Sequence, residues 1–120
     1  TADSVVVRVR ELIDDPDVEI LYDGWGELPP AASYTDSGFT VISEAITQVY
    51  PDAVITPSLL TATTDTRHYI SVVDNLYRFH GLLVGTGQAS TVHGTGEYIS
   101  IESYQNMIEV ERHMLRLGAQ

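Results

Sequence analysis

An apolar stripe between residues 36 and 51 is the feature that most constrains the fold. Apolar side chains recur there every three or four positions, which is the spacing of one face of an α-helix. Thr35 and Asp36 precede the stripe as candidate helix caps, and Pro51 ends it because proline cannot continue a helix. The apolar positions are Phe39, Ile42, Ala45, Ile46 and Val49. We therefore expect an amphipathic helix in this segment.

A second helix is expected at the C-terminal end of the sequence. Ser100 is a candidate N-cap, Glu102 lies in the expected first turn, and Gly118 stands at the expected end. The residues of its apolar face are Ile101, Tyr104, Ile108 and Leu115, with Met107 and Met114 beside them. We interpret this helix as structural.

The N-terminal segment predicts a smaller unit. Residues 3–14 have helical spacing, residues 14–17 form a turn rich in aspartate, and residues 18–22 alternate well enough for one strand. One helix and one strand cannot bury their own apolar faces. We expect their partners to come from elements missing here or from a second copy of the chain.

The middle of the chain contains a linker and short strands. Residues 23–34 read DGWGELPPAASY, a composition typical of a linker, with Trp25 as its only large anchor. Short strands are expected at residues 53–56 and 75–79.

Composition excludes several classes of protein. The chain has 120 residues, 43% of them hydrophobic, which indicates one small globular domain. No apolar run reaches the roughly 20 residues of a membrane helix, and no signal-peptide pattern is present, so a soluble protein is expected. The net charge is −11 and all six basic residues are arginine, so neither a nucleic acid nor an anionic membrane is expected as a partner. Without cysteine, disulfides and thiolate metal sites are excluded.

Residues 62–69, ATTDTRHY, place many hydrogen-bonding groups between two apolar segments. One interpretation is a capped turn that opens a short helix, with Arg67 paired to a surface carboxylate. The other is a ligand platform, in which threonine hydroxyls and helix amides face an oxygen-rich substrate and Arg67 binds a carboxylate. The local sequence leaves both open.

His93 lies in a glycine-rich turn directly before the C-terminal helix, in the run HGTGE. A histidine at a loop tip is either a candidate ligand for an ion or a solvated, backbone-bonded residue. The nearby run GTGQAS is not followed by lysine and does not have the spacing of a phosphate loop, so nucleotide binding is not expected.

The order of three motifs, TTDTRHY, LYRF and HGTGEYISIESY, resembles the C-terminal portion of a family of zinc-dependent peptidases and amidohydrolases. That family includes carboxypeptidase S, Gly-X carboxypeptidase, aminoacylase, acetylornithine deacetylase and succinyl-diaminopimelate desuccinylase. The resemblance implies an α/β fold, a fragment of a helix-covered mixed sheet of the zinc exopeptidase type. Residues 1–24 would close a lid or dimerisation domain of α+β type, residues 25–34 would be a linker, and residues 35–120 would belong to the catalytic domain.

The resemblance also implies roles for individual residues. His93 matches the family's C-terminal zinc ligand, and Gly94 and Glu97 would shape the turn or support the ligand. The implied substrate-binding residues are Thr64, Asp65 and Arg67, of which the arginine would hold the substrate carboxylate. His80 and His113 are interpreted as structural or surface residues.

The implied activity is hydrolysis of the amide bond of N-acyl amino acids or small peptides, with two zinc ions as cofactors. One histidine cannot hold a catalytic zinc, and no catalytic residue is identified in this chain, so we expect the chain alone to be inactive and to self-associate. A homodimer through residues 1–24 is a possible assembly, and the compartment is left open, with the cytoplasm favoured.

The alternative is a self-contained small α+β binding or interaction module without catalysis. In such a module, His93 and Arg67 would not converge on one concavity, and the N-terminal helix and strand would pack into the common core. The hydrolase interpretation predicts convergence of the two residues and a separate N-terminal unit.

Overall fold

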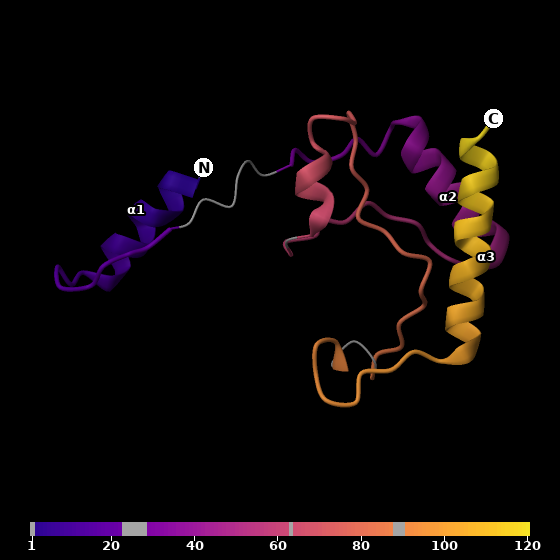
Figure 1. Cartoon of the computed structure of the whole chain (residues 1–120). Helices are drawn as coiled ribbons and strands as arrows, with labels where there is room; N and C mark the ends of the chain where they lie inside the picture. Colours follow the sequence, from indigo (N-terminus) through magenta and orange to yellow (C-terminus); the bar gives the residue numbers. More distant parts are fainter. Residues whose placement is uncertain (1, 23–28, 63, 88–90) are drawn as a thin grey trace.

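The computed structural model describes residues 2–22, 29–62, 64–87 and 91–120. It contains helices α1 (Ala2–Ile13), α2 (Ser37–Val49) and α3 (Ile101–Gly118), and a short 3₁₀ helix, η1 (Asp65–Tyr69) (Figure 1). The three α-helices lie where the periodicity predicted them. Residues 23–28, which include Trp25 and the first part of the expected linker, lie outside the described residues.

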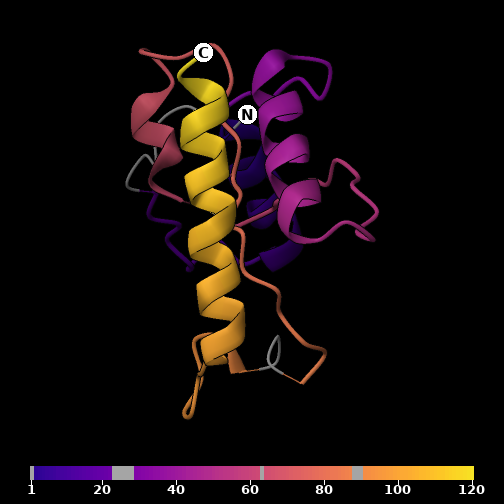
Figure 2. The ribbon, with the colours of Figure 1, turned by 90° about the vertical axis from the view of Figure 1, so that its right-hand side faces the viewer.

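The helices α2 and α3 pack against each other and form the core of the molecule (Figure 2). Ala45 of α2 and Val110 of α3 are fully buried. Gly81 lies against α3 so closely that a Cβ added to it would stand 2.6 Å from the Val110 Cβ. The chain at Gly81 can approach α3 this closely because glycine has no side chain to collide with Val110.

Side-chain caps fix where these two helices begin. The Asp36 carboxylate accepts a hydrogen bond from the Gly38 amide at 3.0 Å, and the Ser100 hydroxyl accepts one from the Ser103 amide at 3.1 Å. Each cap satisfies an amide that has no partner within its own helix. The cap expected at Ser100 is confirmed, and of the two candidates Thr35 and Asp36 the structure uses Asp36.

The expected strands are not formed by any residue that the structure describes. Residues 54–60 and 76–79 are extended, and within the described ranges their backbone amides and carbonyls make no hydrogen bonds. A helix satisfies its own backbone, whereas a strand requires a neighbouring strand. The mixed sheet is therefore not observed, and the same correction applies to residues 18–22.

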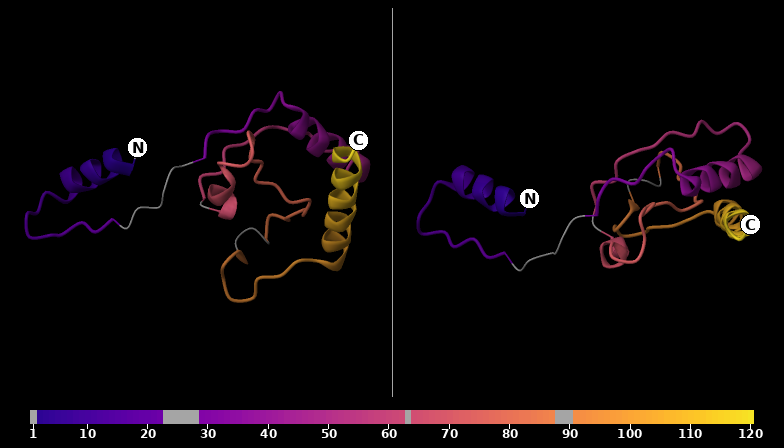
Figure 3. Two further views of the ribbon diagram at one scale, coloured as in Figure 1. Left: turned by 45° about the horizontal axis from the view of Figure 1, so that its top comes forward. Right: turned by 90° about the horizontal axis from the view of Figure 1, so that it is seen from above.

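The N-terminal segment lies apart from the helix pair in Figure 1 and in both views of Figure 3. Among the described residues, α1 contacts neither α2 nor α3. Its apolar residues remain largely exposed, among them Val5 and Leu12. The common core expected for a self-contained module is absent from this part of the chain. The proposed domain boundaries remain predictions.

None of the helices described is both long enough and apolar enough to cross a membrane.

Candidate functional site

His93 occupies an unusual backbone conformation at the tip of its turn. Its φ angle is 63°, in the left-handed region that most side chains avoid and that histidine enters more readily than most. The Gly94 amide donates to the Thr91 carbonyl at 2.8 Å, and the next glycine, Gly96, also has a positive φ of 84°. This geometry leaves His93 exposed to solvent.

Glu97 closes the same turn from its C-terminal side. Its carboxylate accepts a hydrogen bond from the His93 amide at 3.2 Å, and its own amide donates to the Gly94 carbonyl at 3.4 Å. The carboxylate therefore holds the backbone of His93 and not its ring. The His93 imidazole makes no hydrogen bond to any described residue, so its nitrogens are accessible to a ligand.

The cluster of residues 64–69 forms the capped 3₁₀ helix η1. Thr64 is its N-cap, and its hydroxyl accepts from the Thr66 amide at 3.3 Å and lies 2.6 Å from the Thr66 hydroxyl. The Arg67 Nε donates to the His68 Nε2 at 3.2 Å. Asp65 lies in the first turn of η1, where a negative charge favours the helix. Capping explains the two threonines without a ligand, and the substrate role of Thr64, Asp65 and Arg67 stays a prediction.

One contact from outside this cluster was not foreseen. Arg78, twelve residues beyond Thr66, donates from Nε to the Thr66 hydroxyl at 3.0 Å. It belongs to the LYRF motif, which is one of the three motifs of the family resemblance and was expected to be a strand, with no role assigned to the arginine. An arginine within a recognised motif was the available signal, but its partner depends on the tertiary fold.

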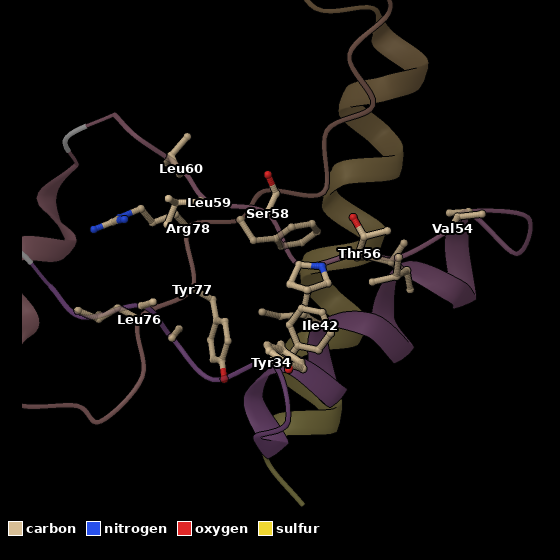
Figure 4. A pocket seen from close by; sticks show the side chains of 18 of the residues that line it. Tyr34, Ile42, Val54, Thr56, Ser58, Leu59, Leu60, Leu76, Tyr77 and Arg78 are labelled. Atoms are coloured by element: carbon tan, nitrogen blue, oxygen red, sulfur yellow. The ribbon is translucent and has the colours of Figure 1, made fainter.

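Arg78 also lines an apolar cavity of about 380 Å³ (Figure 4). The cavity lies over α2 and between the two extended segments, residues 54–60 and 76–79. Its apolar lining includes Phe39, Ile42, Ile46, Val54, Leu59 and Leu76. In Figure 4, the Arg78 guanidinium extends away from Ile42 and Val54 toward the border of the cavity.

The structure does not bring His93 and Arg67 onto this cavity, because neither residue lines it. In Figure 1 the turn that follows residue 90 and the helix η1 lie apart. On this point the geometry agrees with the alternative of a binding module. The exposed position of α1 away from the helix pair agrees with the hydrolase interpretation.

His93 is suited to be one of several ligands of a zinc ion. An exposed imidazole without a hydrogen-bond partner is a suitable zinc donor. In the described part of the chain, no three histidine, aspartate or glutamate residues gather closely enough to hold a metal ion. The remaining donors of a zinc site would have to come from elsewhere.

Tyr77, which lies in the extended segment 76–79 and lines the cavity, has a perturbed pKa. Burial, together with the negative charge of Asp36, raises the pKa of the Tyr77 hydroxyl above its usual value near 10. The hydroxyl donates to the Ser33 carbonyl at 2.7 Å, and its ring lies 6.4 Å from that of Phe39. A neutral tyrosine held in this way serves packing and hydrogen bonding, not proton transfer near neutral pH.

Comparison with known proteins gives matches over most of this chain. The probable carboxypeptidase S-like 2 of Dictyostelium discoideum is 27% identical over 117 residues, which is 97% of this chain and 22% of that protein. The N-fatty-acyl-amino acid synthase/hydrolase PM20D1 of Mus musculus is 30% identical over 112 residues, covering 91% of this chain and 22% of its own length. Carboxypeptidase S of Saccharomyces cerevisiae is 26% identical over 92 residues, covering 68% of this chain and 16% of its own length.

The chain therefore spans about a fifth of the length of the first of these curated relatives. No family model matches the chain, and no solved structure does. The proteins to which it is similar carry the carboxypeptidase and acyl-amino-acid hydrolase names that the three motifs led us to expect.

Proposed function

We propose that this chain, which is related over most of its length to carboxypeptidase S and the N-fatty-acyl-amino acid synthase/hydrolases, is part of a hydrolase. The full protein would cleave the amide bond of N-acyl amino acids or small peptides. The single observation that carries this proposal is similarity over more than nine tenths of the chain to relatives of both names. The chain alone would be inactive, because no complete set of catalytic groups lies within its described residues.

In this proposal His93 is one zinc ligand of the full protein. Its imidazole is exposed, and the Glu97 carboxylate and the Gly94 backbone hold the turn that presents it. When bound, zinc supplies a Lewis acid that polarises a carbonyl and makes water a better nucleophile. The contribution of this chain is to hold the imidazole in place, since ligand orientation depends on such supporting contacts.

Thr64, Asp65 and Arg67 are the proposed substrate-binding residues. Thr64 caps the 3₁₀ helix that contains Asp65 and Arg67, so these polar groups have a defined position before any substrate arrives. Arg67 would offer a planar guanidinium to the free carboxylate of the substrate.

The unpaired extended segments support a proposal for the architecture of the full protein. We propose that residues 54–60 and 76–79 join a larger mixed sheet, with α2 and α3 covering it. An α/β sheet of this kind supplies the backbone partners that the described residues lack. Residues 1–24 would close a lid or dimerisation domain, residues 25–34 would link it, and residues 35–120 would belong to the catalytic domain. Dimerisation through residues 1–24 and a cytoplasmic location remain predictions.

The test uses the full-length protein and two histidine variants. Zinc content is measured by atomic emission, and hydrolysis of an N-acyl amino acid is followed in parallel, for wild type, His93→Ala and His80→Ala. We expect about two zinc ions in wild type and the loss of metal and rate in His93→Ala. His80 is the control, because its Nδ1 accepts a hydrogen bond from the Leu82 amide and is not proposed as a ligand. Equal metal content and rate in both variants would remove His93 from the zinc site.

The binding module remains the second candidate because His93 and Arg67 do not line a common cavity here. A module of this kind would bind an N-acyl amino acid without cleaving it. Calorimetric titration of the full protein, combined with product analysis, separates the two functions, since saturable binding without product would favour the module.

A further inference from the structure

Arg78 differs in its surroundings from the two arginines that form ion pairs on the helices. Arg8 pairs with Glu11 at 3.1 Å, and Arg112 pairs with Glu109, both on exposed helix surfaces. Arg78 is half-buried and makes no ion pair with a described residue. A partly buried cation without a counterion is a costly feature, and it marks a place where an anion is stabilising.

The side chain of Arg78 is oriented by a short chain of hydroxyl groups. The Thr66 hydroxyl accepts from its Nε at 3.0 Å, and the Thr66 hydroxyl in turn lies 2.6 Å from that of Thr64, the cap of η1. This contact uses the Nε–H group at one edge of the guanidinium. Its two terminal nitrogens have no hydrogen-bond partner among the described residues. They form the fork that binds a carboxylate in a bidentate way.

The environment of the fork favours such binding. Arg78 borders the apolar cavity next to the half-buried Leu76, so part of its surroundings is apolar (Figure 4). Charge-assisted hydrogen bonds become stronger where the local dielectric constant is low. The chain itself is acidic, with 17 acidic and six basic residues, so a carboxylate ligand needs a local cation to bind at all.

We propose that Arg78 binds the free carboxylate of the substrate and thereby determines specificity for N-acyl amino acids over neutral amides. This inference rests on the proposed hydrolase function and extends it to a residue outside the expected substrate-binding set. Thr66 is the positioning residue for Arg78, because it touches Nε and leaves the two terminal nitrogens for the ligand. Arg67, whose Nε donates to His68, is the competing candidate for the same role.

The test compares two substrates with the full-length protein. N-dodecanoyl-phenylalanine carries the carboxylate, and N-dodecanoyl-2-phenylethylamine has the same amide bond without it. For Arg78→Gln we expect kcat/KM for the first substrate to fall about 10- to 100-fold, mainly through KM, which is the usual range for a lost charged hydrogen bond. The kcat/KM for the second substrate should change less than about threefold, so the variant should lose most of the preference for the substrate with a carboxylate.

Three further variants make the result interpretable. Arg78→Lys keeps the charge but loses the fork, so we expect an intermediate loss. Thr66→Val removes the hydroxyl that orients Nε, and we expect a smaller loss of the same kind, with the preference reduced and not abolished. Arg116→Gln is the matched control, because Arg116 is exposed on α3 and is assigned no role in binding.

The outcomes separate failure of this inference from failure of the proposed function. If wild type cleaves neither substrate, the hydrolase proposal itself is wrong. If wild type prefers the carboxylate substrate and Arg78→Gln keeps that preference while Arg67→Gln loses it, the carboxylate site belongs to Arg67. If Arg78→Gln lowers both rates equally and also lowers the melting temperature, Arg78 is a structural cation that pairs with another part of the protein.

Discussion

Two regions of the molecule are rich in apolar residues: the helix pair α2 and α3, and the extended segments 54–60 and 76–79. They differ in how far their backbone groups and apolar side chains find partners within the described residues. The helices satisfy their own backbone, carry side-chain caps and contain the two fully buried apolar residues, Ala45 and Val110. The extended segments leave their backbone unpaired within the described residues, and they border a cavity. The difference teaches that a helix needs a partner for its side chains alone, whereas a strand needs a partner for its backbone as well.

The largest effect is expected when the contact between Gly81 and α3 is disturbed. Gly81→Ala would place a Cβ 2.6 Å from the Val110 Cβ, so the helix must shift. We expect a loss of about 1–3 kcal/mol in the free energy of unfolding, measured by urea denaturation. The control is Gly87→Ala, because a Cβ at Gly87 would have no atom within 4 Å. Equal effects of the two changes would mean that α3 does not pack as described.

The same chemical change can be made in both regions by replacing a serine. The buried Ser103 hydroxyl donates to the Leu83 carbonyl at 2.6 Å, which ties α3 to the chain that leads into it. Ser103→Ala would leave that carbonyl without its partner and should cost about 1–2 kcal/mol in urea unfolding. Ser58 is exposed and makes no hydrogen bond to a described residue, so Ser58→Ala should be neutral within about 0.5 kcal/mol. A large effect at Ser58 would show that the extended segment is already held in place.

Tyr77 joins the two regions and gives the contrast a pH dependence. Its pKa is raised in the folded state, so the unfolded state loses its proton at lower pH than the folded state. The resulting stabilisation is complete below the unfolded pKa near 10 and is lost as the pH rises through the raised folded value. Tyr77→Phe should therefore weaken the alkaline loss of stability and cost about 0.5–1.5 kcal/mol at neutral pH.

Urea unfolding followed from neutral to alkaline pH provides the measurement for Tyr77. Tyr98→Phe is the control, because Tyr98 is exposed and does not line the cavity. If both variants show the alkaline profile of wild type, ionisation of Tyr77 is not linked to folding.

The smallest effect on stability is expected in the extended segments. Leu59 is 76% exposed, so Leu59→Ser should change the unfolding free energy of this chain by less than about 0.5 kcal/mol. The same change removes exposed apolar area and should reduce the self-association expected for the chain, measured by sedimentation velocity. A stability loss above about 1 kcal/mol would indicate that residue 59 is packed in the chain alone.

Sequence reasoning succeeded where the signals are local. The caps Asp36 and Ser100 lie within three residues of the amides that they bind, so the pattern alone predicts where α2 and α3 begin. A capped turn was one of the two interpretations left open for residues 62–69, and the structure shows Thr64 as the cap of η1.

The expected strands and the site show where local signals end. The extended segments have the composition of strands, but their partners are not among the described residues, and no local pattern reveals that. The bond from Arg78 to Thr66 joins two residues twelve positions apart, and its existence depends on how the chain folds back. The left-handed backbone of His93 lies between these cases: its glycine neighbours indicate a tight turn, but not which residue adopts a positive φ.

The positive φ of His93 means that folding and metal binding favour different residues at this position. Folding by itself favours glycine or asparagine at residue 93, because these residues enter the left-handed region at low cost. A metal site would favour histidine there in spite of the strain. Variants selected for thermal tolerance alone would thus drift toward glycine at this turn and lose the imidazole, so a gain in robustness would be paired with a loss of chemistry.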